Sequence, residues 1–336
     1  MTRYISPPES FYLRLFFDGV AEAVATRMQK GSTPSEENLT FLFCELLDSN
    51  YTSQHVLKYP LSSLNDDLSK SGAGNTLEIE FQTNEFTRKF EASESYADLG
   101  VVFTRRDPIG GNNLKAILIQ AKRLYSSGRQ FGIYSTYDAF KKTQFDKLYS
   151  LCKSKSAGYY LFYNPLLDAF NEKERDAIKA YELHWHYFDP DLDVLFNMRH
   201  KMGNPWLGLS IPDMDKNTAD SLREQQTQQL SLRPGLRFCG LEGLSGILQK
   251  NPGKLCLKHF YDDAINRSHA NVGDYSSLFS LSDLFLLGLI GCRCGSTDQD
   301  IISIAEGKQP KAVQEIGVGV KHTLKITLRS NVQMPG

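Results

Sequence analysis

Apolar residues follow two different periods along the chain, and the two periods separate predicted helices from predicted strands. Near the N-terminus an apolar stripe at helical spacing predicts one helix, and Thr33-Pro34-Ser35-Glu36 has the layout of a capping box that begins a second. The stripe of this second helix consists of Leu39, Leu42, Phe43, Leu46 and Leu47. Glu45 lies at the edge of the stripe, so its carboxylate can point along the border of the core.

A change to a period of two residues predicts three consecutive strands after these helices. Residues 77–81 alternate between apolar and polar side chains, and the apolar segments 98–103 and 114–122 are joined by a Gly/Asn-rich turn. We expect the three strands to pair as a meander. A helix at 139–152 and a buried strand at 157–163 follow. The order helix, three strands, helix, strand predicts an α/β fold with a central mixed sheet.

The rest of the chain carries shorter elements. We predict a charged helix at 172–183, a helix at 241–249 and a last strand at 324–328, whose alternation indicates one solvent-exposed face. The chain is therefore divided into a core at 1–200 and a C-terminal α+β extension or second domain at 201–336. Nothing in the residues of this second part selects a role for it.

Three polar side chains interrupt the two central apolar strands. Asp98 opens the first strand, and Gln120 and Lys122 lie at the end of the second. If the hairpin centres on Gly110, Asp98 faces Lys122 and Gly100 faces Gln120. A buried carboxylate, amide or ammonium is costly unless it meets a partner or a metal ion. The sequence therefore predicts a site at this end of the sheet.

Composition and charge add one restriction. With 41% hydrophobic and 23% charged residues among 336, the chain has the composition of an ordinary globular protein. A net charge of −1 excludes a globally basic nucleic-acid binder, although the location of charge matters more than its sum. Between Lys115 and Lys155 nine basic residues stand against two acidic ones, a local charge of +7. We therefore predict a basic face around the hairpin.

Cysteine spacing and hydropathy indicate the compartment. The six cysteines show no paired C-x-x-C spacing, which argues against a zinc ribbon or a disulfide framework and favours free thiols. The longest apolar run, 284–292, is about half of what a bilayer crossing needs, and no basic leader precedes a long hydrophobic segment. We expect a cytoplasmic protein without a membrane span.

A helical glutamate, a strand aspartate and a Gln-x-Lys motif on the next strand together resemble the PD-(D/E)xK nuclease superfamily, in the variant with glutamine in place of the second acidic residue. The resemblance covers about Thr33 to Asn164 and implies a restriction-endonuclease-like αβββαβ core. Ala97 stands where the family consensus has proline, and glutamine removes one negative charge from the site. A looser likeness is to nuclease-like proteins of bacterial defence loci.

The resemblance implies a metal-dependent DNA endonuclease acting in restriction or anti-phage defence. Asp98 and Gln120 would lie at the metal, Lys122 would be the catalytic lysine, and Glu45 would match the helical acidic residue. Gln144 would lie on the helix that follows the motif, together with Lys147.

The chemistry calls for these residue types independently of the family. Hydrolysis of a phosphodiester uses a hard divalent cation, here Mg²⁺ with Mn²⁺ as the alternative, to neutralise developing charge and to lower the pKa of a water. Asp98, Gln120, Glu45 and the backbone carbonyl of Ala121 offer oxygen ligands. Lys122 would hold or deprotonate the water, or counter charge on the phosphorane, and the sequence leaves this choice open.

DNA is the expected partner, and RNA is an alternative that the same chemistry permits. The candidate nucleic-acid contacts are Arg123, Lys141, Lys142, Gln144 and Lys147. Double-strand cleavage needs two sites, so we expect a homodimer or a partner subunit of a defence system. His184 and His186 are a weaker candidate metal pair because no third ligand follows at a telling spacing.

Two other interpretations stay open. In the first, Asp98 and Lys122 form an internal ion pair that Gln120 hydrogen-bonds, although such pairs seldom add net stability over apolar residues. In the second, the chain is a non-catalytic nucleic-acid-binding or assembly module that kept a nuclease fold and lost its metal.

Overall fold

The computed structural model describes residues 5, 7–29, 34–50, 56–71, 75–86, 97–107, 111–126, 130–137, 140–152, 157–178, 236–251, 254–268, 278–290, 294–308 and 319–332, and the structural statements below concern these residues. The labelled helices are α1 (Pro7–Gln29), α2 (Glu36–Leu47), α3 (Leu61–Ser71), α4 (Lys142–Cys152), α8 (Leu241–Lys250), α9 (Leu257–Ser268), α10 (Leu281–Ile290) and α11 (Gln299–Ala305), and residues 172–178 of the predicted charged helix are helical as well. The strands are β1 (Asn75–Glu85), β2 (Ala97–Asp107), β3 (Gly111–Tyr125), β4 (Thr136–Tyr137), β5 (Gly158–Tyr163), β6 (Leu236–Gly240), β7 (Leu278–Ser280) and β8 (Val320–Val332).

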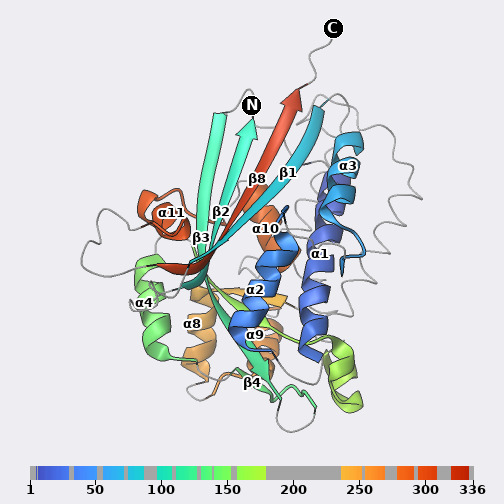
Figure 1. Cartoon of the computed structure of the whole chain (residues 1–336). Coiled ribbons are helices and arrows are strands. Elements are labelled where there is room, and N and C mark those ends of the chain that lie inside the picture. Colours follow the sequence, from blue (N-terminus) through green and yellow to red (C-terminus); the bar gives the residue numbers. More distant parts are fainter. Residues whose placement is uncertain are drawn as a thin grey trace.

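The strands form one open mixed sheet with helices on both sides (Figure 1). The strand order is β1-β8-β2-β3-β5-β6-β7, and β4 pairs with β3 outside this path. β8 runs parallel to β2 and β5 runs parallel to β3, whereas the other neighbours are antiparallel. The predicted α/β class, with a mixed sheet flanked by helices, is confirmed.

The C-terminal part of the chain belongs to this sheet, which corrects two predictions. β8 lies between β1 and β2, so the three predicted strands do not form a meander. β6 and β7 extend the sheet beyond β5, so the described residues after 235 are not a separate extension or second domain. The predicted boundary at residue 200 itself lies outside the described residues.

The burial of β8 agrees with the predicted alternation. The apolar residues at 324, 326 and 328 are buried in the core, whereas Lys321, Lys325 and Arg329 on the opposite face are partly exposed, with 38% of the Lys321 and Arg329 side chains accessible. The two threonines between them, Thr323 and Thr327, are buried, so this second face is only partly open to solvent.

The start of α2 fixes one side of the candidate site. Ser35 is the N-cap, and its hydroxyl accepts a hydrogen bond from the backbone N–H of Asn38 at 3.1 Å. The helix therefore begins at Glu36, with two glutamates in its first turn, where the helix dipole favours negative charge. The capping signal at 33–36 therefore predicts the start of the helix in the correct region, and the residue that caps the helix is Ser35.

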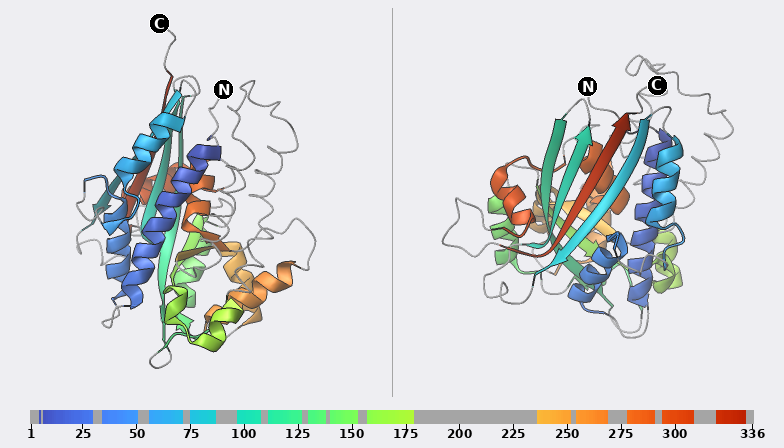
Figure 2. Two further views of the ribbon diagram at one scale, coloured as in Figure 1. Left: turned by 90° about the vertical axis from the view of Figure 1, so that its right-hand side faces the viewer. Right: turned by 45° about the horizontal axis from the view of Figure 1, so that its top comes forward.

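Helices pack on both faces of the sheet, and α1, α2 and α3 lie side by side in the turned views (Figure 2). Alternate residues of a strand point to opposite faces. One face of β2 carries Phe103, whose ring packs against Phe285 of α10. On the other face α11 comes so close that a Cβ at Gly100 would overlap the backbone of Ala305, so this approach requires glycine.

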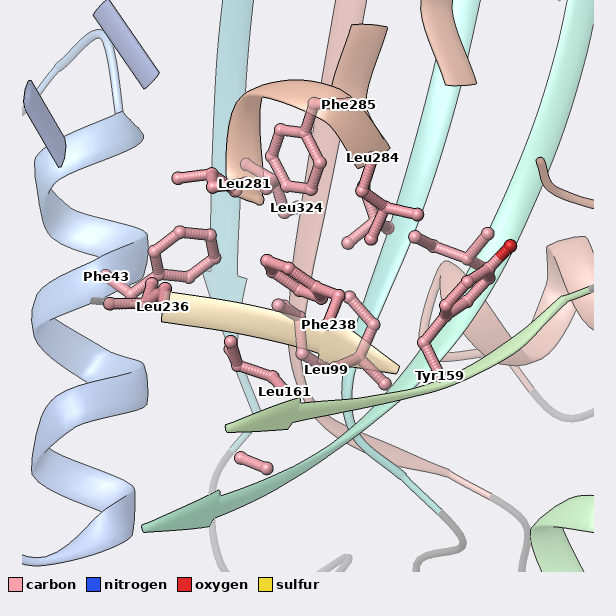
Figure 3. Close-up of a cluster of buried hydrophobic side chains, with 14 of the residues drawn as sticks. Phe43, Leu99, Tyr159, Leu161, Leu236, Phe238, Leu281, Leu284, Phe285 and Leu324 are labelled. Carbon is pink, nitrogen blue, oxygen red and sulfur yellow. The ribbon is translucent and has the colours of Figure 1, made fainter. Parts of the chain in front are cut away.

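An aromatic cluster joins the sheet to the helices of the first face (Figure 3). The ring of Phe285 lies 5.2 Å from that of Phe17 in α1, 5.7 Å from that of Phe103, 6.2 Å from that of Phe238 in β6 and 6.3 Å from that of Phe43 in α2. Most of these pairs meet edge to face, the geometry that the ring quadrupoles favour.

Replacing Phe285 with alanine is expected to lower the free energy of unfolding by about 3–5 kcal/mol, because the ring is buried among four others. Urea denaturation followed by circular dichroism measures the loss. Val56→Ala is the matched control: this side chain is 61% exposed, so a change within about 0.5 kcal/mol is expected. Equal effects of the two replacements would contradict the assignment of this cluster to the core.

Candidate functional site

The predicted hairpin is present with a register two residues away from the predicted one. Leu99 pairs with Ile119 and Gly100 with Leu118, so Asp98 lies beside Gln120 rather than opposite Lys122. Because side chains alternate with a period of two, this difference leaves every side chain on its predicted face. Asp98 and the Gln-x-Lys motif therefore still lie together.

A row of polar side chains crosses four strands at this point. Ala97 pairs with Val320 and Leu99 with His322, which places Lys321 of β8 opposite Asp98. On the other side Gln120 pairs with Tyr160 of β5. Lys321, Asp98, Gln120 and Tyr160 thus share one face of the sheet, at the end where β2 and β8 begin and β3 continues.

The carboxylate of Asp98 is buried and already surrounded by donors. Its Oδ2 accepts hydrogen bonds from the backbone N–H of Ala121 at 2.9 Å and from Nε2 of Gln120. Its Oδ1 lies 3.7 Å from Nζ of Lys321. The backbone of β3 therefore holds Asp98 in place independently of any ligand.

The amide of Gln120 connects Asp98 to α4. Nε2 of Gln144 donates to Oε1 of Gln120 at 2.7 Å. Nε2 of Gln120 lies 3.4 Å from the carbonyl oxygen of Ala121, in addition to its bond to Asp98. In this arrangement the nitrogen of Gln120, not its oxygen, points toward the carboxylate.

Lys122 is buried and reaches the first residue of α2. Its Nζ lies 3.3 Å from Oε1 of Glu36, with 5% of the lysine side chain and 28% of the glutamate side chain exposed. Burial raises the pKa of Glu36, Lys122 lowers it, and the charge of Asp98 raises it again, with a net upward shift. We call Glu36, Asp98, Gln120 and Lys122 the strand-end cluster.

Glu45, the helical acidic residue of the sequence interpretation, lies elsewhere on α2. Nine residues separate it from Glu36, which corresponds to about 13 Å along the helix axis and a rotation of about half a turn. Glu45 is only partly buried, and burial raises its pKa. The helical carboxylate at the cluster is therefore Glu36.

The five predicted nucleic-acid contacts lie in different environments. Arg123 is buried, where it donates to the carbonyl of Pro34 at 2.6 Å and stacks 4.4 Å from the ring centroid of Tyr125. It ties β3 to the residue before the N-cap of α2, and its guanidinium is not at the surface. Gln144 belongs to the amide contact with Gln120.

The three predicted lysine contacts lie at the start of α4 or on it. Lys141 and Lys142 are exposed, and Lys142 forms an i,i+4 ion pair of 2.7 Å with Asp146. Lys147 is half-buried. The candidate histidines at 184 and 186 lie outside the described residues.

Three residues near the site were missed by sequence reasoning. Glu36 was assigned only a capping role, Lys321 lies in a strand that the sequence does not place beside Asp98, and Tyr160 lies in the predicted buried strand 157–163 without a role in the site. Only Glu36 could have been found from the sequence, because the capping motif places its carboxylate at the start of a helix. The other two depend on strand order.

The donor set determines what kind of cation could bind. The described residues contain no group of three or more His, Cys, Asp and Glu that could hold a metal ion. Asp98 and Glu36 are carboxylates, and Ala121 adds a backbone carbonyl next to Asp98. Such hard oxygen donors suit Mg²⁺, which binds through one or two carboxylates and keeps several waters.

Gln120 fits this donor set only after its amide turns. With Oε1 directed to Asp98, the present hydrogen bond would be lost, and the amide oxygen and the carboxylate would both be available to hold a cation. Nε2 would then face Gln144, whose amide would also turn and present its oxygen as the acceptor. The two amides therefore change orientation together.

Comparisons with known proteins assign no family. No family model matches the chain, and neither the curated proteins nor the solved structures include a significant match. In the described part of the chain, none of the helices has both the length and the hydropathy needed to span a bilayer.

Proposed function

We propose that this protein is a metal-dependent phosphodiesterase that cleaves DNA, built on a restriction-endonuclease-like core. The observation that carries the proposal is the strand-end cluster: two carboxylates, an amide and a buried lysine in two neighbouring hydrogen-bonded pairs, Asp98–Gln120 and Glu36–Lys122, with the charge of Asp98 raising the pKa of Glu36. Buried charge of this kind is costly and is concentrated at functional sites. The element order α2, α3, β1, β2, β3, β4, α4, β5 contains the expected helix, three strands, helix and strand, with α3 and the short β4 in addition, and this supports the core assignment.

Each residue of the cluster has a role in this proposal. Asp98, the carbonyl of Ala121 and the turned amide of Gln120 would hold Mg²⁺ or Mn²⁺. The bound ion would supply Lewis-acid stabilisation of the phosphoryl oxygens and a water of lowered pKa. Lys122 would orient a water or counter negative charge on the phosphate, and Glu36 keeps the lysine in place.

The partners follow from the same proposal. Lys141 and Lys142 offer exposed positive charge beside α4, on the side of the sheet that carries Gln120. Cleavage of both strands needs two sites, so a homodimer or a partner subunit completes the proposal. We place this activity in the cytoplasm and in restriction or anti-phage defence.

One observation favours a second candidate function. Each carboxylate of the cluster already has an ammonium near it: Lys122 beside Glu36 and Lys321 beside Asp98. A balanced set of charges can persist without a metal, which supports a non-catalytic nucleic-acid-binding module. The two candidates differ in whether a divalent cation changes what the protein does to DNA.

Metal removal tests the proposal directly. We expect the full-length protein to nick or linearise supercoiled plasmid in Mg²⁺, to stop when EDTA is added, and to recover when excess Mg²⁺ or Mn²⁺ is returned. Lys308→Met, which removes an exposed lysine paired with Glu306, is the control preparation and should cleave like the wild type.

The other outcomes assign other functions. Cleavage of single-stranded RNA with intact plasmid would assign a ribonuclease. Plasmid binding that is unchanged by Mg²⁺ and EDTA, without any cleavage, would contradict the phosphodiesterase proposal and support the binding module.

A further inference from the structure

Tyr160 lies next to the strand-end cluster and its ring is held rigidly. It pairs with Gln120 in the parallel ladder between β3 and β5, so it projects from the same face. Its ring centroid lies 5.6 Å from that of Phe140, 6.2 Å from that of Phe145 and 6.0 Å from that of Phe162. The aromatic contacts fix the position of the hydroxyl.

The hydroxyl of Tyr160 has no hydrogen-bond partner, although the residue is fully buried. Its neighbours on β5 differ in this respect. The hydroxyl of Tyr163 donates to Oγ1 of Thr40 at 3.0 Å, and that of Tyr159 lies 3.2 Å from Sγ of Cys294. An unsatisfied buried hydroxyl destabilises a protein, and phenylalanine would fill the same space without this cost. The hydroxyl therefore calls for an explanation outside packing.

The charges around Tyr160 define what it can do. A tyrosine phenol has an ordinary pKa of about 10 and is protonated at neutral pH, and the negative charges near Tyr160 are those of Asp98, Glu36 and Asp146. A protonated phenol in this position is a hydrogen-bond donor that needs an acceptor oxygen. The cluster beside it contains the carboxylates and the lysine that the proposed function assigns to phosphodiester binding.

We propose that the Tyr160 hydroxyl donates a hydrogen bond to a phosphate oxygen of a ligand bound at the strand-end cluster. The choice of phosphate rests on the proposed function. In the ligand-bound protein this bond satisfies the buried hydroxyl and adds a neutral donor to the positive charges of Lys122 and Lys321. In this proposal Tyr160, which lies on β5, is a residue that makes the site specific for ligands with a phosphate oxygen.

Thermal melting of the full-length protein separates this role from packing. Tyr160→Phe removes the unpaired hydroxyl, so without ligand its Tm should equal or exceed that of the wild type. Tyr163→Phe is the matched control on the same strand: it breaks the bond to Thr40 and should lower Tm. The probe is inorganic phosphate in the presence of Mg²⁺, titrated at constant ionic strength with NaCl.

The phosphate titration decides the proposal. We expect phosphate to raise the Tm of the wild type and of Tyr163→Phe at the same concentrations, and Tyr160→Phe to need about tenfold more, as for a lost hydrogen bond to a charged group. The proposal is overturned if Tyr160→Phe responds like the wild type, if the wild type does not respond, or if Tyr160→Phe alone is destabilised without ligand.

Plasmid cleavage distinguishes failure of this inference from failure of the proposed function. If the wild type cleaves DNA but phosphate binding does not depend on Tyr160, the nuclease proposal stands and the role of Tyr160 falls. If no cleavage is seen but phosphate binding depends on Tyr160, the phosphate site stands and the nuclease proposal falls.

Discussion

Replacing Asp98 with asparagine is expected to reduce Mg²⁺-dependent DNA cleavage by a factor on the order of 1000, because the only carboxylate in the Asp98–Gln120 row of the described sheet loses its charge. Asparagine keeps the shape and an oxygen that can accept from the N–H of Ala121, so the fold should remain. Single-turnover cleavage of a labelled duplex measures the loss, and circular dichroism checks the fold.

The control for this replacement is Asp262→Asn on α9. Asp262 forms an i,i+4 ion pair of 2.5 Å with Lys258 and is not a member of the strand-end cluster. Loss of such a partly exposed pair costs little, so cleavage should be unchanged. If Asp98→Asn and Asp262→Asn cleave equally, the active site is not at the strand-end cluster.

The sequence predicted the local elements well because local patterns determine them. Five predicted elements have their counterparts in α2, β1, β2, β3 and β5, and the helix after the hairpin is α4. The meander failed because β8 arrives from the far end of the chain and pairs between β1 and β2. Alternation of apolar and polar residues shows that a segment is a strand, but not which strand it joins.

In the site, too, the sequence predicts what depends on local pattern and misses what depends on tertiary placement. Asp98 and Gln120 meet as expected, because a register difference of two residues preserves the face. The helical carboxylate could not be chosen from the stripe of α2, since both ends of the helix carry glutamates. Tertiary placement selects Glu36, because the first turn of α2 meets Lys122 of β3.

Lys122→Met is expected to abolish cleavage and to lower the free energy of unfolding by about 2 kcal/mol at neutral pH, because it leaves Glu36 half-buried without its partner. Lys122 lowers the pKa of Glu36, so its removal raises that pKa further above its ordinary value of 4.5. A raised pKa in the folded state stabilises the protein fully below the ordinary value, and this contribution is lost as pH rises through the raised value. The deficit of the variant should therefore be larger at pH 7 than at pH 5, as measured by urea denaturation.

The double variant Glu36→Gln/Lys122→Met decides between a structural ion pair and a functional one. It removes both charges, so no uncompensated charge stays buried and most of the lost stability should return. If the pair serves only the fold, the double variant should behave like the wild type in every assay. If Lys122 acts on phosphate or water, stability recovers while cleavage stays absent. If a stable double variant cleaves at the wild-type rate, neither Glu36 nor Lys122 takes part in the proposed chemistry. The reason is that the double variant carries no ammonium group at position 122 that could hold a water or counter the charge of the phosphate.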